Sequence, residues 1–337
     1  MTATKESAAR NVQGREMARS AKIREAEESL AIRAAWLHYA GGLTQAEVAK
    51  RLGVAGVKAH RLIMRANEAG LVKVRIDGDV AECVELEDRL SRAFGLTYCE
   101  IVPDLHEEGL PVRALGLAGA GYIQRVIESR SSGVIGVGHG RTLAAAVREL
   151  PHVDAAGVRF VSLLGGLTRN YAANPHDVMH RLAEKTGAQA YVMPVPFFAN
   201  SVEDRTVLLS QRGVSDVFKL AATADLMIVG VGTTEPHAQL VSSRMVETVE
   251  IAEVKARGGL GEVLGHFFDE QGRPIETSLT QRTLSLGLDE LRGSNIVAIA
   301  GGAEKTCAIR SVLMSGLLGG LITDERTAHA LSTGLPA

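Results

Sequence analysis

The chain has 337 residues, of which 46% are hydrophobic, 23% charged and 4% aromatic. This length exceeds one small module and predicts about two domains with room for a sizeable core. The formal net charge is -2, but residues 1–80 hold 14 Lys and Arg against 9 Asp and Glu, whereas the remaining residues hold 23 against 30. A basic head on an acidic body is expected when only the head meets nucleic acid.

Cysteine usage and hydropathy narrow the class of protein further. Cys83, Cys99 and Cys307 are isolated, with no C-x-x-C spacing, which argues against a disulfide framework and against a structural zinc site. The N-terminal segment lacks an apolar core of signal-peptide type, and no apolar run reaches the roughly 18 residues that span a bilayer. We expect a cytoplasmic protein with no membrane partner, no metal and no cofactor.

The first expected element is a helix. Residues 1–25 are polar and without a clean period, and we interpret them as a disordered or frayed arm. Residues 27–40 show the apolar period of an amphipathic helix, which Gly41 and Gly42 end. The residues expected to face a core are Leu30, Ala34 and Leu37, with Trp36 as a further candidate.

Residues 43–65 predict two short helices joined by a tight turn. Thr44 is a favourable N-cap, and Glu47, three residues later, completes a capping box in which each side chain bonds the other's backbone amide. Gly53 supplies the left-handed residue that ends the first helix. The second helix is expected to turn Val57, Leu62 and Ile63 inward.

This pair of helices is typical of a helix-turn-helix domain, placed here at 26–78, whose second helix presents a cationic face to a DNA groove. The alternating segment at 71–76 is suited to a short strand or wing. A helical hairpin in a bundle and a pure oligomerisation module would show a similar pattern, so both alternatives stay open. The residues expected to contact double-stranded operator DNA are Thr44, Gln45, Ala55, Lys58, His60, Arg61 and Arg65.

A different pattern covers residues 97–337, after a linker helix predicted at 79–96. Short runs rich in Val and Ile alternate with segments of helical period. Continuous apolar strands of this kind are buried on both faces of a parallel sheet, which predicts a doubly wound α/β domain. The runs lie at 98–104, 133–138, 159–166, 190–196, 226–232 and 295–302.

Four glycine-containing loops follow these runs. In open α/β sheets, ligands bind at the carboxyl ends of the strands, where glycine lets backbone amides approach and the next helix presents its N-terminus. Arg141 and Thr142 add donors for a phosphate or polyol, although a turn that serves packing alone is the alternative. Lys305 would add a point charge and Glu262 an acceptor for sugar hydroxyls. We find no catalytic triad, nucleophile elbow or metal-ligand spacing. The loops lie at 136–142, 163–170, 230–236 and 300–305.

The combined motifs resemble those of the SorC family of bacterial transcriptional regulators, whose effector domain is similar to the sugar-phosphate isomerase fold. The similarity covers nearly the whole chain from about residue 27. Family recognition helices often carry Ser-Arg and Val-Ser pairs where this chain has Ala55-Gly56 and Ala59-His60. The motifs, in chain order, are LTQAEVAKRLGV, HRLIMRANEAGLV, GVGHGRTL, LLGGLTRN, ADLMIVGVG, GEVLGHFFDEQGRPI, VAIAGGAEKTCAI and LITDERTAHAL.

This resemblance implies a regulator of carbohydrate or polyol catabolism rather than an enzyme, a tetramer that binds a sugar, sugar phosphate or polyol. The alternative is a sugar-phosphate isomerase-like enzyme with an accessory N-terminal domain. Glu262 replaces a commoner Asp of the family, and His139 a commoner bulky residue. The effector residues that the resemblance implies are Gly138, Gly140, Arg141, Thr142, Gly165, Gly166, Glu262, Leu264 and Lys305, to which the loops add His139 and Gly232.

Overall fold

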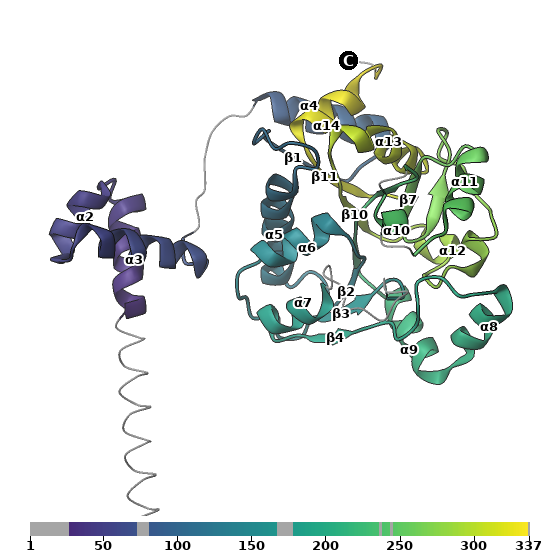
Figure 1. Ribbon diagram of the computed structural model, residues 1–337, viewed down its shortest axis with the longest axis horizontal. Helices are drawn as coiled ribbons and strands as arrows, with labels where there is room; N and C mark the ends of the chain where they lie inside the picture. The colour runs from purple at the N-terminus through teal and green to yellow at the C-terminus, as the bar shows by residue number, and fades with distance from the viewer. Residues whose placement is uncertain (1–26, 73–80, 167–177, 236–237, 243–244, 336–337) are drawn as a thin grey trace, which may run out of the picture. The chain divides into compact units, whose positions relative to one another are not determined.

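The computed structural model describes residues 27–72, 81–166, 178–235, 238–242 and 245–335 (Figure 1). The chain divides into two compact units, Met1–Gly78 and Asp79–Ala337. The arm expected at 1–25 and most of the wing expected at 71–76 lie outside the described residues. Within the described residues, no helix has both the length and the apolar character needed to cross a bilayer.

The first unit contains the helices that the sequence predicts. Residues 27–35 are helical and run into a π-helical segment, η1 (Trp36–Ala40), which α2 (Gln45–Leu52) and α3 (Gly56–Glu68) follow. The predicted capping box is present: the Thr44 hydroxyl accepts the Glu47 amide, and the Glu47 carboxylate accepts the Thr44 amide at 2.8 Å. Gly53 ends α2 with a φ of 66°, as predicted. This geometry fixes the angle at which the chain leaves α2 and enters α3.

Side chains at helical spacing form the core of this unit, and two predictions about them are wrong. Val57 is 75% exposed and Trp36 is 64% exposed. On α3 the buried positions are spaced three and four residues apart, which leaves Val57 on the opposite face. Trp36 is likewise rotated away from the buried face of its helix. The buried positions include Ala31, Ala34, Val48, Ala59, Leu62, Ile63 and Ala66.

A seven-stranded parallel sheet forms the centre of the second unit, with strand order β1-β11-β10-β5-β2-β3-β4. Five of the six predicted runs contain one of its strands, and the run at 190–196 overlaps the end of β4. The predicted doubly wound α/β class is confirmed. The sequence prediction missed β11. The strands are β1 (Tyr98–Val102), β2 (Val134–Val137), β3 (Arg159–Ser162), β4 (Gln189–Tyr191), β5 (Leu226–Val229), β10 (Ile296–Ile299) and β11 (Gly320–Asp324).

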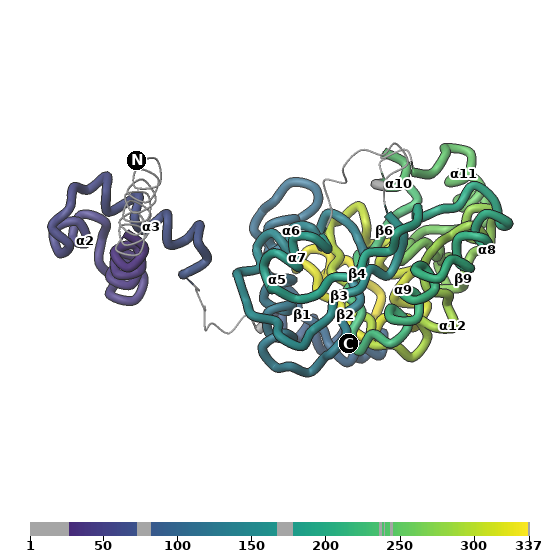
Figure 2. The backbone as a smooth tube through the Cα atoms, turned by 90° about the horizontal axis from the view of Figure 1, so that it is seen from below, coloured from purple at the N-terminus to yellow at the C-terminus, as the bar shows by residue number. Residues whose placement is uncertain are grey.

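Helices cover both faces of this sheet, because successive strand side chains alternate between two cores. Leu226 and Ile228 of β5 belong to the core that packs against α5 and α6, whereas Met227 and Val229 belong to the core on the opposite face. Figures 1 and 2 agree in placing α5, α6 and α7 on one side and α8, α9 and α11 on the other. The helices are α5 (Val112–Ser129), α6 (Arg141–Glu149), α7 (Met179–Thr186), α8 (Val202–Ser210), α9 (Arg212–Ala222), α10 (Gln239–Ser242), α11 (Thr248–Ala256) and α12 (Leu288–Leu291).

Three further helices form a connected group, in which the last helix contacts both of the others. The helix expected as a linker at 79–96 is α4 (Ala81–Phe94), which packs against β1 and α14 within the second unit. The others are α13 (Thr306–Met314) and α14 (Glu325–Ser332). Two short 3-10 turns complete the set, η2 (Thr280–Arg282) and η3 (Ala303–Lys305).

A small antiparallel sheet, which the sequence prediction missed, lies beside the main one. Its order is β6-β7-β8-β9. Leu264 and Gly265 form the tight turn between β7 and β8, with φ values of 51° and 81°, as a two-residue hairpin turn with positive φ at both positions requires. The strands are β6 (Gly232–Thr233), β7 (Gly261–Val263), β8 (His266–Phe268) and β9 (Pro274–Ile275).

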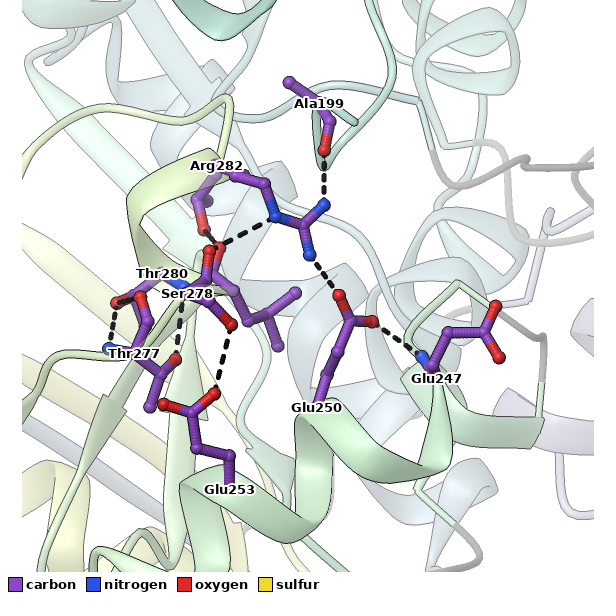
Figure 3. A network of polar contacts seen from close by, with 10 residues as sticks. Ala199, Glu247, Glu250, Glu253, Thr277, Ser278, Thr280 and Arg282 are labelled. Carbon is purple, nitrogen blue, oxygen red and sulfur yellow. Dashed lines mark hydrogen bonds and ion pairs between the residues drawn. The ribbon is translucent and has the colours of Figure 1, made fainter. Parts of the chain in front are cut away.

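A largely buried ion pair joins α11 to η2 (Figure 3). The Arg282 guanidinium pairs with the Glu250 carboxylate, and the two side chains are 13% and 15% exposed. Arg282 also donates to the Ala199 carbonyl, while Glu250 accepts the Glu247 amide and so caps α11. The pair therefore joins α11, η2 and the segment before α8.

We expect Arg282→Met to lower the free energy of unfolding by about 2–4 kcal/mol, because it leaves the Glu250 carboxylate buried without its counterion. Denaturant titration measures the loss. Arg292→Met is the control: its partner is Asp289, both side chains are well exposed, and such pairs contribute at most about 1 kcal/mol. Equal losses in the two variants would contradict a stabilising role for the buried pair.

Candidate functional site

A cavity lies where strands β2, β5 and β10 end. Its polar residues come from the loops after these strands and from the β7–β8 hairpin, so segments far apart in the sequence meet there. Including its open mouth, the hollow has a volume of about 740 Å³. The carboxyl edge of a doubly wound sheet is the expected place for a ligand.

Most of the effector residues expected from the sequence line this cavity, and Gly165 and Gly166 do not. The lining residues among them are Gly138, His139, Gly140, Arg141, Thr142, Gly232, Glu262, Leu264 and Lys305. The loops after β2, β5 and β10 and the hairpin therefore converge, whereas the glycines after β3 lie elsewhere.

Two of the polar groups expected to face a ligand are bonded to the protein itself. The Gly138 amide donates to the Ile228 carbonyl at 2.9 Å, and the Thr142 hydroxyl donates to the Ile299 carbonyl at 2.8 Å. These bonds tie the loop after β2 to strands β5 and β10. Through these bonds both groups hold the cavity wall in place.

Positive charge enters the cavity from two directions. Arg141 opens α6, a nine-residue helix whose N-cap is Gly140 with a φ of 138°, so the positive end of the helix dipole lies at the rim. Lys305 follows β10, and its ammonium donates to the Val231 carbonyl at 2.7 Å. Helix end, guanidinium and ammonium together favour an anionic or hydroxyl-rich ligand.

The Glu262 carboxylate is the acceptor of the site. Only 8% of this residue is exposed, and one of its oxygens accepts the Gly265 amide at 2.6 Å. The other oxygen lies against Gly232, where an added Cβ would stand only 2.1 Å from it. Glycine at 232 is therefore a condition for the carboxylate to occupy this place.

Burial shifts both charged groups of the floor toward neutrality. Desolvation raises the pKa of Glu262 to about 7, against the opposing effects of the Gly265 amide and of Lys305. Desolvation and the nearby Arg141 lower the pKa of Lys305 to about 8, against the opposing effect of Glu262. A ligand whose hydroxyl or anionic oxygens contact these groups would stabilise their charged forms.

Apolar side chains complete the wall, and apart from Leu264 sequence reasoning did not single them out. Leu264 has a left-handed backbone conformation and lines the cavity together with Phe197. This conformation is strained for a leucine, and strained residues occur most often at functional sites. The glycine loop after β5 was a sequence signal for part of this wall. Phe197 carried none, since it precedes α8 and reaches the cavity only through the fold. The additional lining residues are Leu110, Leu164, Phe197, Gly230, Val231, Thr233, Ala238 and Leu240.

Gly165 and Gly166 lie where the loop after β3 approaches the backbone of Val195 and Pro196. The Gly166 amide donates to the Val195 carbonyl at 2.7 Å, and the Gly165 amide donates to Leu284 at 3.0 Å. An added Cβ on Gly165 would stand 2.2 Å from the Pro196 carbonyl oxygen, whereas one on Gly166 would meet nothing closer than 3.7 Å. Packing therefore accounts for the glycine at 165.

We expect Gly165→Ala to destabilise the protein by about 1–3 kcal/mol, because the backbone of Pro196 must shift to admit the methyl group. Gly166→Ala is the matched control and should change the free energy of unfolding by less than about 1 kcal/mol. Thermal and denaturant unfolding of the two variants measure the difference. Equal stability of both would show that the close approach at Gly165 carries no constraint.

Glu262→Gln should make the ligand-free protein more stable at pH 8. The unfolded carboxyl titrates near 4.5 and the folded one near 7, so the folded state holds the extra proton between these values and the free energy of unfolding falls as pH rises through that window. Removing the charge should stabilise the protein by about 1–3 kcal/mol at pH 8, with little difference below pH about 5.

Denaturant titrations at pH 5 and pH 8 measure this difference. Glu276→Gln, the same change at an exposed position, should show no such pH-dependent gain. A Glu262 variant that is less stable than the parent at both pH values would contradict a desolvated carboxylate.

All seven residues expected to contact DNA are exposed on the first unit. Lys58, Arg61 and Arg65 are spaced three and four residues apart and therefore share one face of α3. Arg65 pairs with Glu27 at 2.8 Å through side chains about half exposed, so contact with a phosphate would require it to leave this weak pair. The remaining members are Thr44, Gln45, Ala55 and His60.

The chain matches a protein family model and is similar to named transcriptional regulators. A family model described as "Putative sugar-binding domain" matches residues 78–332. The chain is 61% identical over 307 residues to the erythritol catabolism regulatory protein EryD of Brucella abortus (strain 2308), covering 91% of this chain and 97% of that protein. It is 30% identical over 319 residues to the transcriptional regulator LsrR of Klebsiella pneumoniae, covering 93% and 95%.

Solved structures share the fold. The full-length sorbitol operon regulator SorC from Klebsiella pneumoniae superposes with a TM-score of 0.67 at 24% identity, covering 90% of this chain and 99% of that one. A DeoR family transcriptional regulator from Listeria monocytogenes gives a TM-score of 0.68 at 23% identity, covering 74% and 99%. At these identities the likeness supports the α/β architecture.

Proposed function

The chain belongs to the SorC family of ligand-responsive transcriptional regulators with a sugar-binding domain, and we propose that its first unit binds operator DNA while the cavity of its second unit binds the effector. The observation that carries the effector site is the convergence of Glu262, Lys305 and Arg141 on one cavity at the carboxyl edge of the sheet. The cationic, exposed face of α3 supports the DNA site.

The effector that best fits the cavity is a small polyol or its phosphate. The Glu262 carboxylate accepts hydrogen bonds from hydroxyl groups, while Lys305 and the N-terminus of α6 bind an anionic oxygen. The apolar wall around Leu264 and Phe197 suits the carbon face of a sugar. Because a relative of 61% identity is named a regulator of erythritol catabolism, we propose erythritol or an erythritol monophosphate as the effector.

We also propose a non-catalytic role for this protein. Its relatives are named regulators, and we propose that the cavity returns its ligand unchanged. We further propose that the protein acts in the cytoplasm, where operator DNA lies, as a homotetramer. Sedimentation equilibrium tests the assembly, and a dimer or monomer at micromolar concentration would overturn that part.

The test of the proposed function is a footprint on the DNA upstream of the chain's own gene, with and without erythritol and erythritol monophosphate. An effector should change operator affinity by about 5- to 150-fold, and the ligand recovered afterwards should be unchanged. No protection at moderate salt, or protection that neither compound alters, would overturn the proposal.

Arg61→Ala separates the two sites. It should weaken operator binding by roughly 5- to 150-fold, the equivalent of about 1–3 kcal/mol for a lost DNA contact, and leave the effector affinity within about twofold. Arg33→Ala removes the same charge from an exposed position on the first helix and should cost less. Fluorescence anisotropy and calorimetry measure the two affinities; parallel losses of both would argue against separate sites.

A further inference from the structure

A closed ring of hydrogen bonds joins the ends of β10 and β11. Asp324 is the last residue of β11 and the N-cap of α14, and one of its oxygens accepts the Thr327 amide at 3.0 Å. Its other oxygen accepts the Thr327 hydroxyl at 2.6 Å and the Gly302 amide at 3.0 Å. The Gly302 amide is also within 2.8 Å of the Thr327 hydroxyl oxygen. Both side chains are at most 3% exposed.

This ring fixes the backbone that carries Lys305. Gly302 has a φ of 100°, and an added Cβ on Gly301 would stand 2.2 Å from the Asp324 carboxylate. The Lys305 amide donates to the Gly302 carbonyl at 2.9 Å, so η3 is built on the turn that the ring holds. Lys305 then reaches the cavity, where its ammonium donates to Val231. Hydrogen bonds therefore connect the backbone of Lys305 to the N-terminus of α14.

The other end of this connection is α4. His329 of α14 lies 3.2 Å from Glu82 of α4, and Arg89 of α4 donates to the Ser332 carbonyl at 3.4 Å. Cys83, Leu86 and Leu90 of α4 share a core with Ala328 and Leu331 of α14. Because α4 begins at Ala81 and the first unit ends at Gly78, a displacement of α14 acts on the helix that follows the DNA-binding unit in the chain.

The polar part of the contact between α4 and α14 can change at low cost. Its ion pair is exposed, with side chains 48% and 65% exposed, and such pairs are weak. Within the described part of the chain, the buried Arg89 Nε and the buried Thr323 hydroxyl, next to Asp324, have no hydrogen-bond partner. A small displacement that gives either group a hydrogen-bond partner is favoured by the bond that it gains.

We propose that Asp324 and Thr327 are positioning residues that couple the cavity to the DNA-binding unit through α14 and α4. The inference rests on the proposed function. An effector oxygen that takes the Lys305 ammonium from the Val231 carbonyl displaces η3 and the Gly302 turn, and the ring transmits this displacement to the N-terminus of α14. The ligand then shifts the equilibrium because it binds one arrangement of this connection better than the other.

Thr327→Val tests the coupling directly. Valine matches threonine in shape and replaces the hydroxyl with a methyl group, whereas Thr327→Ser keeps the hydroxyl and removes the methyl group. Operator affinity is measured by anisotropy with and without saturating erythritol or erythritol monophosphate. The valine variant should reduce the effector-induced change from about 5- to 150-fold to roughly 2- to 10-fold, while the serine variant should stay within about twofold of the parent.

Ser201→Ala is the matched control for the loss of a helix cap. The Ser201 hydroxyl caps α8 by accepting the Asp204 amide at 3.0 Å, and Ser201 does not line the cavity. If Thr327 has a purely structural role, Thr327→Val and Ser201→Ala should both lose thermal stability and keep the full effector response. That result would overturn the inference, whereas a parent protein that shows no effector response would overturn the proposed function instead.

A measurement on the parent protein covers the case in which Thr327→Val does not fold. Hydrogen exchange of the full chain, with and without erythritol or its monophosphate, should change by at least about threefold in rate for amides of α14 and α4. Unchanged exchange in both helices, together with an altered rate at Lys305, would show that binding stops at the cavity and would overturn the coupling.

Discussion

The burial of the Glu262 carboxylate beside Lys305 is the constraint on which the second unit depends. A desolvated carboxylate is costly, and the surrounding structure is arranged to keep it in place. Gly232 leaves room for its oxygen, and the Gly265 amide binds it within a hairpin that forces Leu264 into a left-handed conformation. These features lower the stability of the empty protein and leave polar groups that a ligand can satisfy.

Sequence patterns predicted the parallel sheet well because their physical cause is local. Continuous apolar runs must be buried on both faces, and that requirement holds wherever the strand lies in the sheet. The antiparallel hairpin was not predicted, because Glu262 and the glycines around it are typical of a loop. Its turn is formed by Leu264 and Gly265, and a leucine at positive φ is an exception to the usual turn residues.

The cavity was predictable in position and less so in chemistry. Glycine loops after β2, β5 and β10 pointed to the right edge of the sheet, because parallel strands end together. The partners of single polar atoms were not predictable. Thr142 bonds the Ile299 carbonyl rather than facing the cavity as a free donor, and Asp324 holds the Gly302 turn from a strand that the apolar pattern did not reveal.

The wrong predictions in the first unit have a common cause. Val57 and Trp36 are large and apolar, and both were assigned to the apolar faces of their helices, but the buried positions of those helices leave them pointing outward. In a small domain the core accepts few side chains, and alanines at positions 31, 34, 59 and 66 occupy it. Close helix packing through small residues then leaves the larger ones at the surface.

Stability and response are linked through the same groups. A buried acid and a buried base, each shifted toward its neutral form, make the empty cavity a higher-energy state that ligand contacts can relieve. For this energy to alter DNA binding, the ligand must favour one arrangement of a connected element, since equal affinity for both arrangements shifts nothing. Lys305 belongs to such a connected element, because the backbone that holds it in the cavity is bonded to the cap of α14.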